Sequence, residues 1–333
     1  MARKRKFRHL VRMPLEWLGV AVAFAVIPQL PRRWLYALCD FLAAVMYRCD
    51  RRGRRRSLHN LRRLRAPVKD DAPSALYAEF TFDPDRAAYD PTAAEAKIIR
   101  RSYRNMARTV GYLFWTCRRA RTRTAAAGDM GAAGRRFLAA NPVAITVSGH
   151  FGCWEILSQL AYLEGHPMMS VSKPIGSRAL TALLIRSRRS IGQEIVYAEG
   201  AFKPLLQALR CGKSLGLLVD QSVAPKRGGV WVRFLGLPMA VSAAPAFFAA
   251  KGGVPIGVAW SRPLKDGRYR CELVDTVTAA AARDIWATTQ RIASDLERLA
   301  RRHPSAWVLN YNYFSNIPRP EDLAGLVRRE EKA

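Results

Sequence analysis

The C-terminal two thirds of the chain, beginning after Gly128, alternates between short β-prone runs and segments whose apolar residues recur at helical spacing. Strands separated by helices form a mainly parallel sheet that helices cover on both faces. This alternation predicts an α/β fold. The predicted strands are 143–148, 168–172, 194–198, 215–219, 254–260 and 269–274, and the predicted helices between and after them are 152–163, 177–191, 201–211, 242–251 and 283–302.

The chain before this region reads as mostly helical. Apolar positions at helical spacing predict a helical region over 31–64, which the arginine-rich run 51–56 interrupts. Residues 65–91 are acidic and contain several prolines, so we expect a loop or insertion there. Thr92 then begins a helix that runs to about Ala127. The expected organisation is therefore a membrane-anchoring segment over 1–30, an N-terminal helical region over 31–127 with a loop insertion at 65–91, an α/β core over 128–317 and a C-terminal tail over 318–333.

The N-terminus combines a basic tract with an apolar segment. Residues 1–12 are basic, and residues 13–30 are mostly apolar but contain Glu16 and Pro28. The apolar segment is shorter than the ~20 residues that a spanning helix needs, so it is either a marginal span or a helix lying in the interface. Both interpretations place the protein on a membrane, and the basic tract favours the anionic cytoplasmic leaflet. The alternative is a buried first helix beside a basic arm. No cleavable signal peptide is apparent.

The charge balance points to an anionic partner. The chain has 55 Lys and Arg against 26 Asp and Glu, a formal net charge of +29. Nucleic acid, an anionic membrane or a phosphorylated substrate would each fit such a charge. The basic residues lack the interleaved aromatic side chains of single-strand binders, so we do not expect nucleic acid. Six cysteines without a C-x-x-C pair argue against a zinc site or a disulfide scaffold and are typical of a reducing cytosol.

Residues 142–163 read as a buried strand, a tight turn and a helix, and they carry the first candidate site. Five positions within one regular helix are rotated about 140° apart, so His150 and Glu155 meet only if His150 lies in the turn and Glu155 reaches back from the helix. A carboxylate on one imidazole nitrogen leaves the other free as a general base. Gly149 and Gly152 would let a substrate approach the backbone, whose N–H groups would hold an oxyanion. The plain alternative is a surface histidine followed by an ordinary helical glutamate.

The string from Ser148 to Glu155, Ser-Gly-His-Phe-Gly-Cys-Trp-Glu, resembles the H-x4-D/E block of the glycerolipid acyltransferase superfamily. Its form is similar to the branch that contains the late acyltransferases of lipid A biosynthesis. The resemblance implies that His150 is the base and Glu155 the acid that orients it. It also implies acyl transfer from an acyl carrier protein thioester, or from acyl-CoA, to a hydroxyl of a membrane glycolipid, most directly a lipid A precursor. No metal, cofactor or covalent intermediate is called for.

A second block ends the predicted strand 215–219 with Asp220 and Gln221. Ligands of open parallel sheets bind beyond the carboxyl ends of the strands, so Asp220 is expected to face the same crevice as His150. The family resembled above has a comparable D-Q or D-x-D element. Alternatively, Asp220 merely caps a turn. Residues 234–238 resemble a further family block, after which Ser242 is expected to cap a helix.

Two basic residues are weaker candidates for substrate phosphate. Arg189 lies in a helix that also carries Arg186 and Arg188, and its planar guanidinium suits phosphate, although a solvated helix face explains these arginines equally well. Lys173 is a candidate because it follows a predicted strand. Cys153, close to His150, is not expected to act as a nucleophile. The run Gly212-Lys213-Ser214 lacks the earlier glycine of a phosphate-binding loop.

The C-terminal block departs from the resembled family. Lipid A acyltransferases commonly carry a W-x-H-x-R-F type block, whereas the residues after Trp307 place Asn310 and Asn312 where the His and Arg would be. The acceptor is therefore left open between a lipid A precursor, another glycolipid and a lysophospholipid. A competing class is an inactive basic protein that binds membranes or nucleic acid. The expected location is the cytoplasmic face of the inner membrane, reached through a single N-terminal anchor or peripherally.

Overall fold

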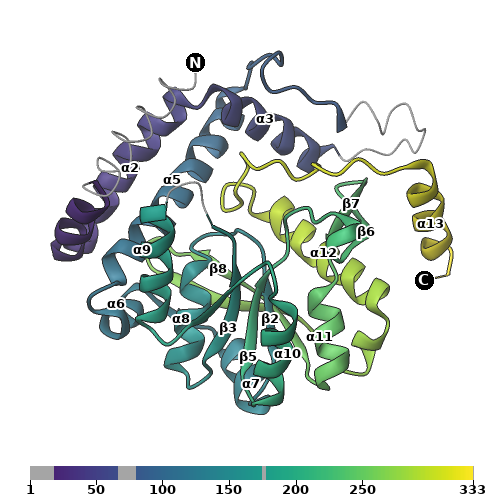
Figure 1. Ribbon diagram of the computed structural model, residues 1–333. Coiled ribbons are helices and arrows are strands. Elements are labelled where there is room, and N and C mark those ends of the chain that lie inside the picture. The colour runs from purple at the N-terminus through teal and green to yellow at the C-terminus, as the bar shows by residue number, and fades with distance from the viewer. Residues whose placement is uncertain (1–18, 67–79, 175–177, 333) are drawn as a thin grey trace, which may run out of the picture.

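The computed structural model describes residues 19–66, 80–174 and 178–332 (Figure 1). Its centre is a seven-stranded sheet in the order β1-β9-β8-β2-β5-β3-β4, flanked by helices. The predicted α/β fold with a mainly parallel sheet is confirmed. The strands of this sheet are β1(Gly128–Met130), β2(Ile145–Ser148), β3(Met168–Ser172), β4(Glu194–Tyr197), β5(Ser214–Leu218), β8(Ile256–Pro263) and β9(Tyr269–Val277).

The strands from β8 to β4 run parallel, and β9 pairs with β8 in the antiparallel sense. The central strand β2 lies between β5 and β8, with Ile145 and Val147 fully buried. A strand covered on both faces is expected to be continuously apolar, which is why the sequence marks it so clearly. The carboxyl ends of β2 and β5 are neighbours, with Ser148 opposite Leu218. This edge is where the residues of the candidate site emerge.

Helices cover both faces of the sheet, as Figure 1 shows. On one face α7 and α8 contact the strands, and on the other α10, α11 and α12 contact them. The helices of this part are α7(Ala132–Ala140), α8(Glu155–Leu163), α9(Arg178–Arg189), α10(Phe202–Arg210), α11(Ala244–Gly252), α12(Ile285–Arg302) and α13(Pro320–Glu330), with 3-10 turns at η2(Pro225–Arg227) and η3(Ala281–Arg283).

The N-terminal helices pack over the carboxyl edge of the sheet (Figure 1). The predicted region 31–64 consists of two helices that meet at Asp50, whose side chain accepts a hydrogen bond from the backbone N–H of Gly53. Thr92 caps the next helix in a capping box with Glu95, as its position predicts. These helices are α2(Arg32–Cys49), α3(Arg51–Arg65), α5(Ala93–Thr116) and α6(Ala120–Ala127), preceded by the 3-10 turn η1(Ile27–Gln29).

Several predicted boundaries are wrong. The helix expected over 92–127 is broken, because α5 ends at Thr116 and α6 begins at Ala120. The helix expected from 152 begins at Glu155, since the preceding residues form a turn. Ser242 lies in a strand, and the cap of α11 is Ala243. Elements that the sequence analysis did not predict are β1, α7, α13 and the antiparallel hairpin of β6(Gly229–Phe234) and β7(Leu237–Ser242).

The expected membrane anchor lies largely outside the described residues, which begin at 19. Residues 19–26 are helical and lead into η1. Among the helices of residues 19–66, 80–174 and 178–332, none has the length and apolar character needed to cross a bilayer. Of the insertion expected at 65–91, residues 67–79 also lie outside the described part, and 81–91 contain no helix or strand.

Candidate active site

His150 and Asp220 meet at the carboxyl edge of the sheet, each two residues beyond its strand. The imidazole Nδ1 lies 2.7 Å from Asp220 Oδ1, and the backbone N–H of His150 donates to Oδ2 at 2.9 Å. One carboxylate therefore fixes both the ring and the main chain of His150. The position of Asp220 after a buried strand predicts that this side chain faces the same crevice as His150. In the structure the two side chains are in direct contact.

A buried tryptophan completes the support of this carboxylate. The indole Nε1–H of Trp307 donates to Asp220 Oδ2 at 3.0 Å, and Trp307 stacks on Tyr313 with ring centroids 4.1 Å apart. The segment around Trp307 also pairs with the turn that carries His150, since Val308 N donates to His150 O and Gly152 N donates to Ala306 O. In the sequence, Trp307 is visible only as part of the C-terminal block, and nothing there predicts its contact with Asp220.

The electrostatics of the pair favour an imidazolium beside a carboxylate. Burial by itself lowers the pKa of His150, but the charge of Asp220 and the hydrogen bond to it outweigh burial, so the pKa is raised above its ordinary value. Burial raises the pKa of Asp220, yet the charge of His150 and the hydrogen bonds to its carboxylate outweigh it, so the pKa is lowered. The ion pair thus compensates the desolvation of both groups.

The second imidazole nitrogen is the one available for chemistry. An ionised Asp220 only accepts hydrogen bonds, which assigns the Nδ1 proton to the bond with Asp220 and leaves the lone pair of neutral His150 on Nε2. The side-chain amide nitrogen of Gln221 lies 3.5 Å from Nε2. The ring of Trp154 stands edge-on to the imidazole, with centroids 5.0 Å apart. His150 therefore presents the Nε2 lone pair, with the Gln221 amide within hydrogen-bond distance of it, and a neutral imidazole held in this way can accept a proton.

Glu155 does not contact the imidazole as the sequence analysis expected. Its carboxylate is bound by the Arg188 guanidinium, at 2.6 and 2.9 Å, and by the indole N–H of Trp154 at 3.1 Å. Glu155 begins α8 and is buried, and a buried carboxylate needs a cation. Arg188 supplies that cation from α9, which the spacing of His150 and Glu155 alone could not indicate. The negative charge of Glu155 still acts at a distance and contributes to the raised pKa of His150.

Comparison with known proteins identifies the family. A model of the bacterial lipid A biosynthesis acyltransferases matches residues 1–74 and 89–314. The chain belongs to this family. It is therefore an acyltransferase of lipid A biosynthesis, and the resemblance found in the sequence is confirmed. Residues 75–88, which the family model does not match, lie within the segment 65–91 where we expected an insertion. A search of curated proteins found no match.

The two glycines that flank His150 and Phe151 serve the packing of the turn itself. A Cβ on Gly149 would lie 2.7 Å from the ring of Phe151 and 3.0 Å from the Asp220 carboxyl. Gly152 has φ +55°, and its Cβ would lie 2.0 Å from the Ser261 carbonyl oxygen. Neither position is open to substrate. The N–H groups of residues 150–152 donate to Asp220, Gly149 O and Ala306 O, so these three expected oxyanion donors are already used.

Of the expected cations, the structure places Arg188 rather than Arg189 at the candidate site. Arg188 is mostly buried and bonds both Glu155 and the hydroxyl of Ser172 at 3.0 Å. Arg189 and Lys173 are exposed, and no contact joins either to His150. Cys153 is fully buried, and burial raises the pKa of its thiol far above its ordinary range, which disfavours the thiolate that a nucleophile requires.

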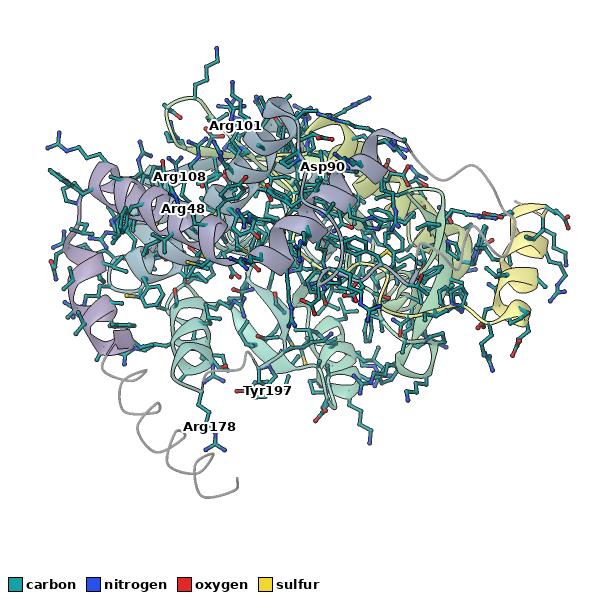
Figure 2. All side chains as sticks on the ribbon, turned by 90° about the horizontal axis from the view of Figure 1, so that it is seen from above. Arg48, Asp90, Arg101, Arg108, Arg178 and Tyr197 are labelled. Atoms are coloured by element: carbon teal, nitrogen blue, oxygen red, sulfur yellow. The ribbon has the colours of Figure 1, made fainter. Side chains whose placement is uncertain are left out.

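A small cavity of about 60 Å³ adjoins the candidate site. It is lined by Trp154, Glu155 and Arg188 together with side chains of β2, β3 and β5. Apolar side chains are exposed at the same strand ends, namely Val171, Leu218 and Tyr197, the last labelled in Figure 2. Within the described part of the chain, no group of three His, Cys, Asp or Glu side chains is placed to hold a metal ion.

Proposed function

We propose that this protein transfers a fatty acyl chain from an acyl carrier protein thioester, or from acyl-CoA, to a hydroxyl of a lipid A precursor, with His150 as general base. The observation that carries the proposal is the His150–Asp220 pair, which fixes the ring and leaves Nε2 beside Gln221 in a member of this family. Exposed apolar side chains at the neighbouring strand ends suit a lipid substrate.

The reaction follows from the position of Nε2. Neutral His150 takes the proton of the acceptor hydroxyl. At the same time the hydroxyl oxygen attacks the thioester carbonyl carbon, which gives a tetrahedral oxyanion. The carbon–sulfur bond then breaks, and the imidazolium returns its proton to the departing thiolate, so that ester and thiol are the products. Asp220 holds the ring and stabilises the imidazolium, and the more distant charge of Glu155 adds to this stabilisation.

The oxyanion needs donors other than the N–H groups of residues 150–152, since those groups are already bonded. We assign this role to the amide of Gln221, because it lies beside the atom that receives the proton. Arg189 and Lys173, exposed on the segments that follow β3, are proposed to meet phosphates of the donor or acceptor. The site works at the cytoplasmic face of the inner membrane, where lipid acceptor and soluble donor meet.

The acceptor is the least constrained part of the proposal. The resembled family carries His and Arg where this chain has Asn310 and Asn312. Asn310 lies near the hydroxyl of Tyr103, on α5, rather than beside His150. Another glycolipid or a lysophospholipid would use the same base and the same reaction, so the change at these positions concerns the acceptor and not the chemistry.

The test is mass spectrometry of total membrane lipids from cells with and without the gene, complemented by variants. We expect one lipid species heavier by an acyl group only when an active gene is present. His150→Ala removes the base and should abolish that species, whereas Cys153→Ser should retain it because the thiol has no part in the reaction. An acylated product formed by His150→Ala would refute the assignment of the base. No lipid change with the intact gene would favour an inactive basic binding protein.

A further inference from the structure

A large groove lies away from His150, between α2, α3, α5 and the segment before α5. It has a volume of about 1180 Å³. Its charged lining is almost entirely cationic. The single acid is Asp40, which is already paired with Arg108 at 2.7 Å. The basic residues that line the groove are Arg48, Arg54, Lys97, Arg100, Arg101 and Arg104. Figure 2 shows Arg48, Arg101 and Arg108 on one face of the molecule.

Three of these cations are available to a ligand, whereas Arg104 is paired with Asp40 and Arg100 stacks on Tyr47. Among the described residues, Arg48, Lys97 and Arg101 have no hydrogen-bond or ion-pair partner. Arg54 is held between the rings of Tyr47 and Tyr89, at 5.4 and 5.0 Å, and its Nε is buried without an acceptor. The groove therefore calls for an anion with several acceptor oxygens, as in a phosphate.

An exposed apolar ridge borders this groove. Helix α2 buries Leu35, Cys39 and Ala43 against α5, but a second face of the same helix carries large apolar side chains to the surface. Trp34 is 59% exposed and Phe41 65% exposed. The remaining members of the ridge are Leu38, Leu42, Val45 and Met46. Arg48, one helical turn beyond this ridge, lines the groove, so apolar and cationic surfaces meet along α2.

We propose that this face of α2 and α5 is a membrane-contact surface that binds an anionic phospholipid bilayer. The lipid phosphates occupy the cationic groove, and Trp34 and Phe41 enter the acyl region beside them. A helix with an apolar face and flanking cations lies in the interface in this way. An acidic protein would match the cations equally well, but it would leave the large apolar ridge without a role. The ridge therefore favours the bilayer.

The surface is separate from the catalytic centre. Lys97, Arg101 and Arg104 line the groove, whereas the opposite side of α5 holds the site through Ser102, which donates to Trp307 O, and Thr109, which donates to Gly152 O. The helix thus has a membrane side and a catalytic side. The inference rests on the proposed function only in that the acceptor is a membrane lipid, and a binding experiment without substrate separates the two.

The experiment is sedimentation of the full-length protein with vesicles of phosphatidylglycerol and phosphatidylethanolamine, and with vesicles of phosphatidylcholine alone. We expect Lys97→Glu/Arg101→Glu to weaken binding to the anionic vesicles about 30-fold or more, since each cation near such a surface contributes about fivefold. Raised salt should remove this difference. Trp34→Ser/Phe41→Ser should weaken binding to both kinds of vesicle. The matched controls are Arg328→Glu/Arg329→Glu and Val327→Ser on α13, which are exposed far from the groove (Figure 1).

Two results would overturn the proposal. One is unchanged vesicle binding by both double variants, which would place the contact elsewhere in the chain. The other is retained vesicle binding with lost binding of purified acidic carrier protein, which would make the groove a protein-docking site. Thermal melts establish that the variants are folded, and Lys97→Gln/Arg101→Gln provides a milder change. Acyl transfer to a detergent-dispersed acceptor should be unaltered in the groove variants, so an inactive wild type would count against the proposed function alone.

Discussion

At the scale of single residues, the side chain that most defines the site is Asp220, because it fixes both the ring and the backbone of His150. The same contact controls when the base is available. Asp220 holds the pKa of His150 above its ordinary value of 6.5, and the imidazole accepts a proton only in its neutral form. The rate should therefore rise with pH through the raised pKa of His150.

The first prediction concerns Asp220→Asn. In a profile of kcat/KM against pH, we expect the acidic limb of the wild type to lie above pH 6.5. The variant keeps the burial of His150 but loses the negative charge, so the limb should move below pH 6.5 and the plateau should fall about 100-fold or more. The control is Asp129→Asn on the distant strand β1. It removes a carboxylate paired with Arg270 and should leave the acidic limb in place. An unshifted limb in Asp220→Asn would show that Asp220 does not set the pKa.

The same pair gives a signed expectation for stability. Because the pKa of His150 is raised, its stabilising contribution is complete below pH 6.5 and disappears as the pH rises through the raised value. Because the pKa of Asp220 is lowered, its contribution is complete above 3.8 and disappears as the pH falls through the lowered value. The ion pair therefore stabilises the fold most between these limits.

The residues of the site differ in how visible they were in the sequence. His150 was singled out by its spacing to Glu155 and by the resemblance of the surrounding string to a known motif. Asp220 was expected beside it because it follows a buried strand, and parallel strands bring their carboxyl ends to the same edge. The partner of Glu155 was not found, because Arg188 comes from a separate helix and neighbouring arginines offer the same pattern. Gly149 and Gly152 were noticed as special, but only the positions of Asp220 and Ser261 show that the protein itself fills the space beside them.

At the scale of elements, α3 and α5 clamp the C-terminal segment that carries Trp307. Asn60 on α3 donates both of its amide hydrogens, to Leu309 O at 2.8 Å and to Tyr311 O at 2.9 Å. Asn60 is itself buried. One side chain thus fixes two carbonyl groups that lie almost 250 positions away, immediately after the tryptophan that supports Asp220.

The second prediction concerns this clamp. Asn60→Ala leaves two carbonyls without a donor, and each unsatisfied buried group costs about 1–3 kcal/mol, so urea titration should show a free energy of unfolding lower by about 2 kcal/mol or more. Asn60→Asp keeps the shape but has no N–H donor, so it should be at least as destabilising. Asn141→Ala, at the C-terminus of α7, removes only a local bond to Phe137 O and should cost less. A fully stable Asn60→Asp would contradict the role of the amide.

Elements with strong local patterns were predicted well, and those defined by tertiary contacts were not. The central strands were recognised because burial on both faces makes them continuously apolar, and α5 because of Thr92 and its cap. The hairpin of β6 and β7 was missed because it packs as a separate pair against α12, beyond the βα alternation. The break between α5 and α6 has no proline or glycine to mark it.

At the scale of the whole molecule, the N-terminal helices are part of the frame of the site. The hydrophobic core that contains Ile145 and Trp307 extends without interruption to Leu61 on α3 and Ile99 on α5. Polar contacts follow the same route. The side chains of Ser102, Asn105 and Thr109 on α5 donate to backbone carbonyls of Trp307, Ser305 and Gly152. Side chains of α5, distant in sequence, thus hold the turn that carries His150 and the segment around Trp307.

The third prediction follows from this shared core. A fragment of residues 128–317 keeps the strands β1 to β9 and the His150–Asp220 pair but loses the helices that cover Trp307, so we expect it to lack a cooperative urea transition monitored by near-ultraviolet circular dichroism. Deletion from residue 319 onward removes α13, whose contacts include the buried Leu326 and an ion pair of Glu330 with Arg233, and should retain such a transition. A cooperative transition in the 128–317 fragment would show that the sheet and its own helices suffice for the fold. The N-terminal helices would then serve the site, or the membrane, without being needed to build the core.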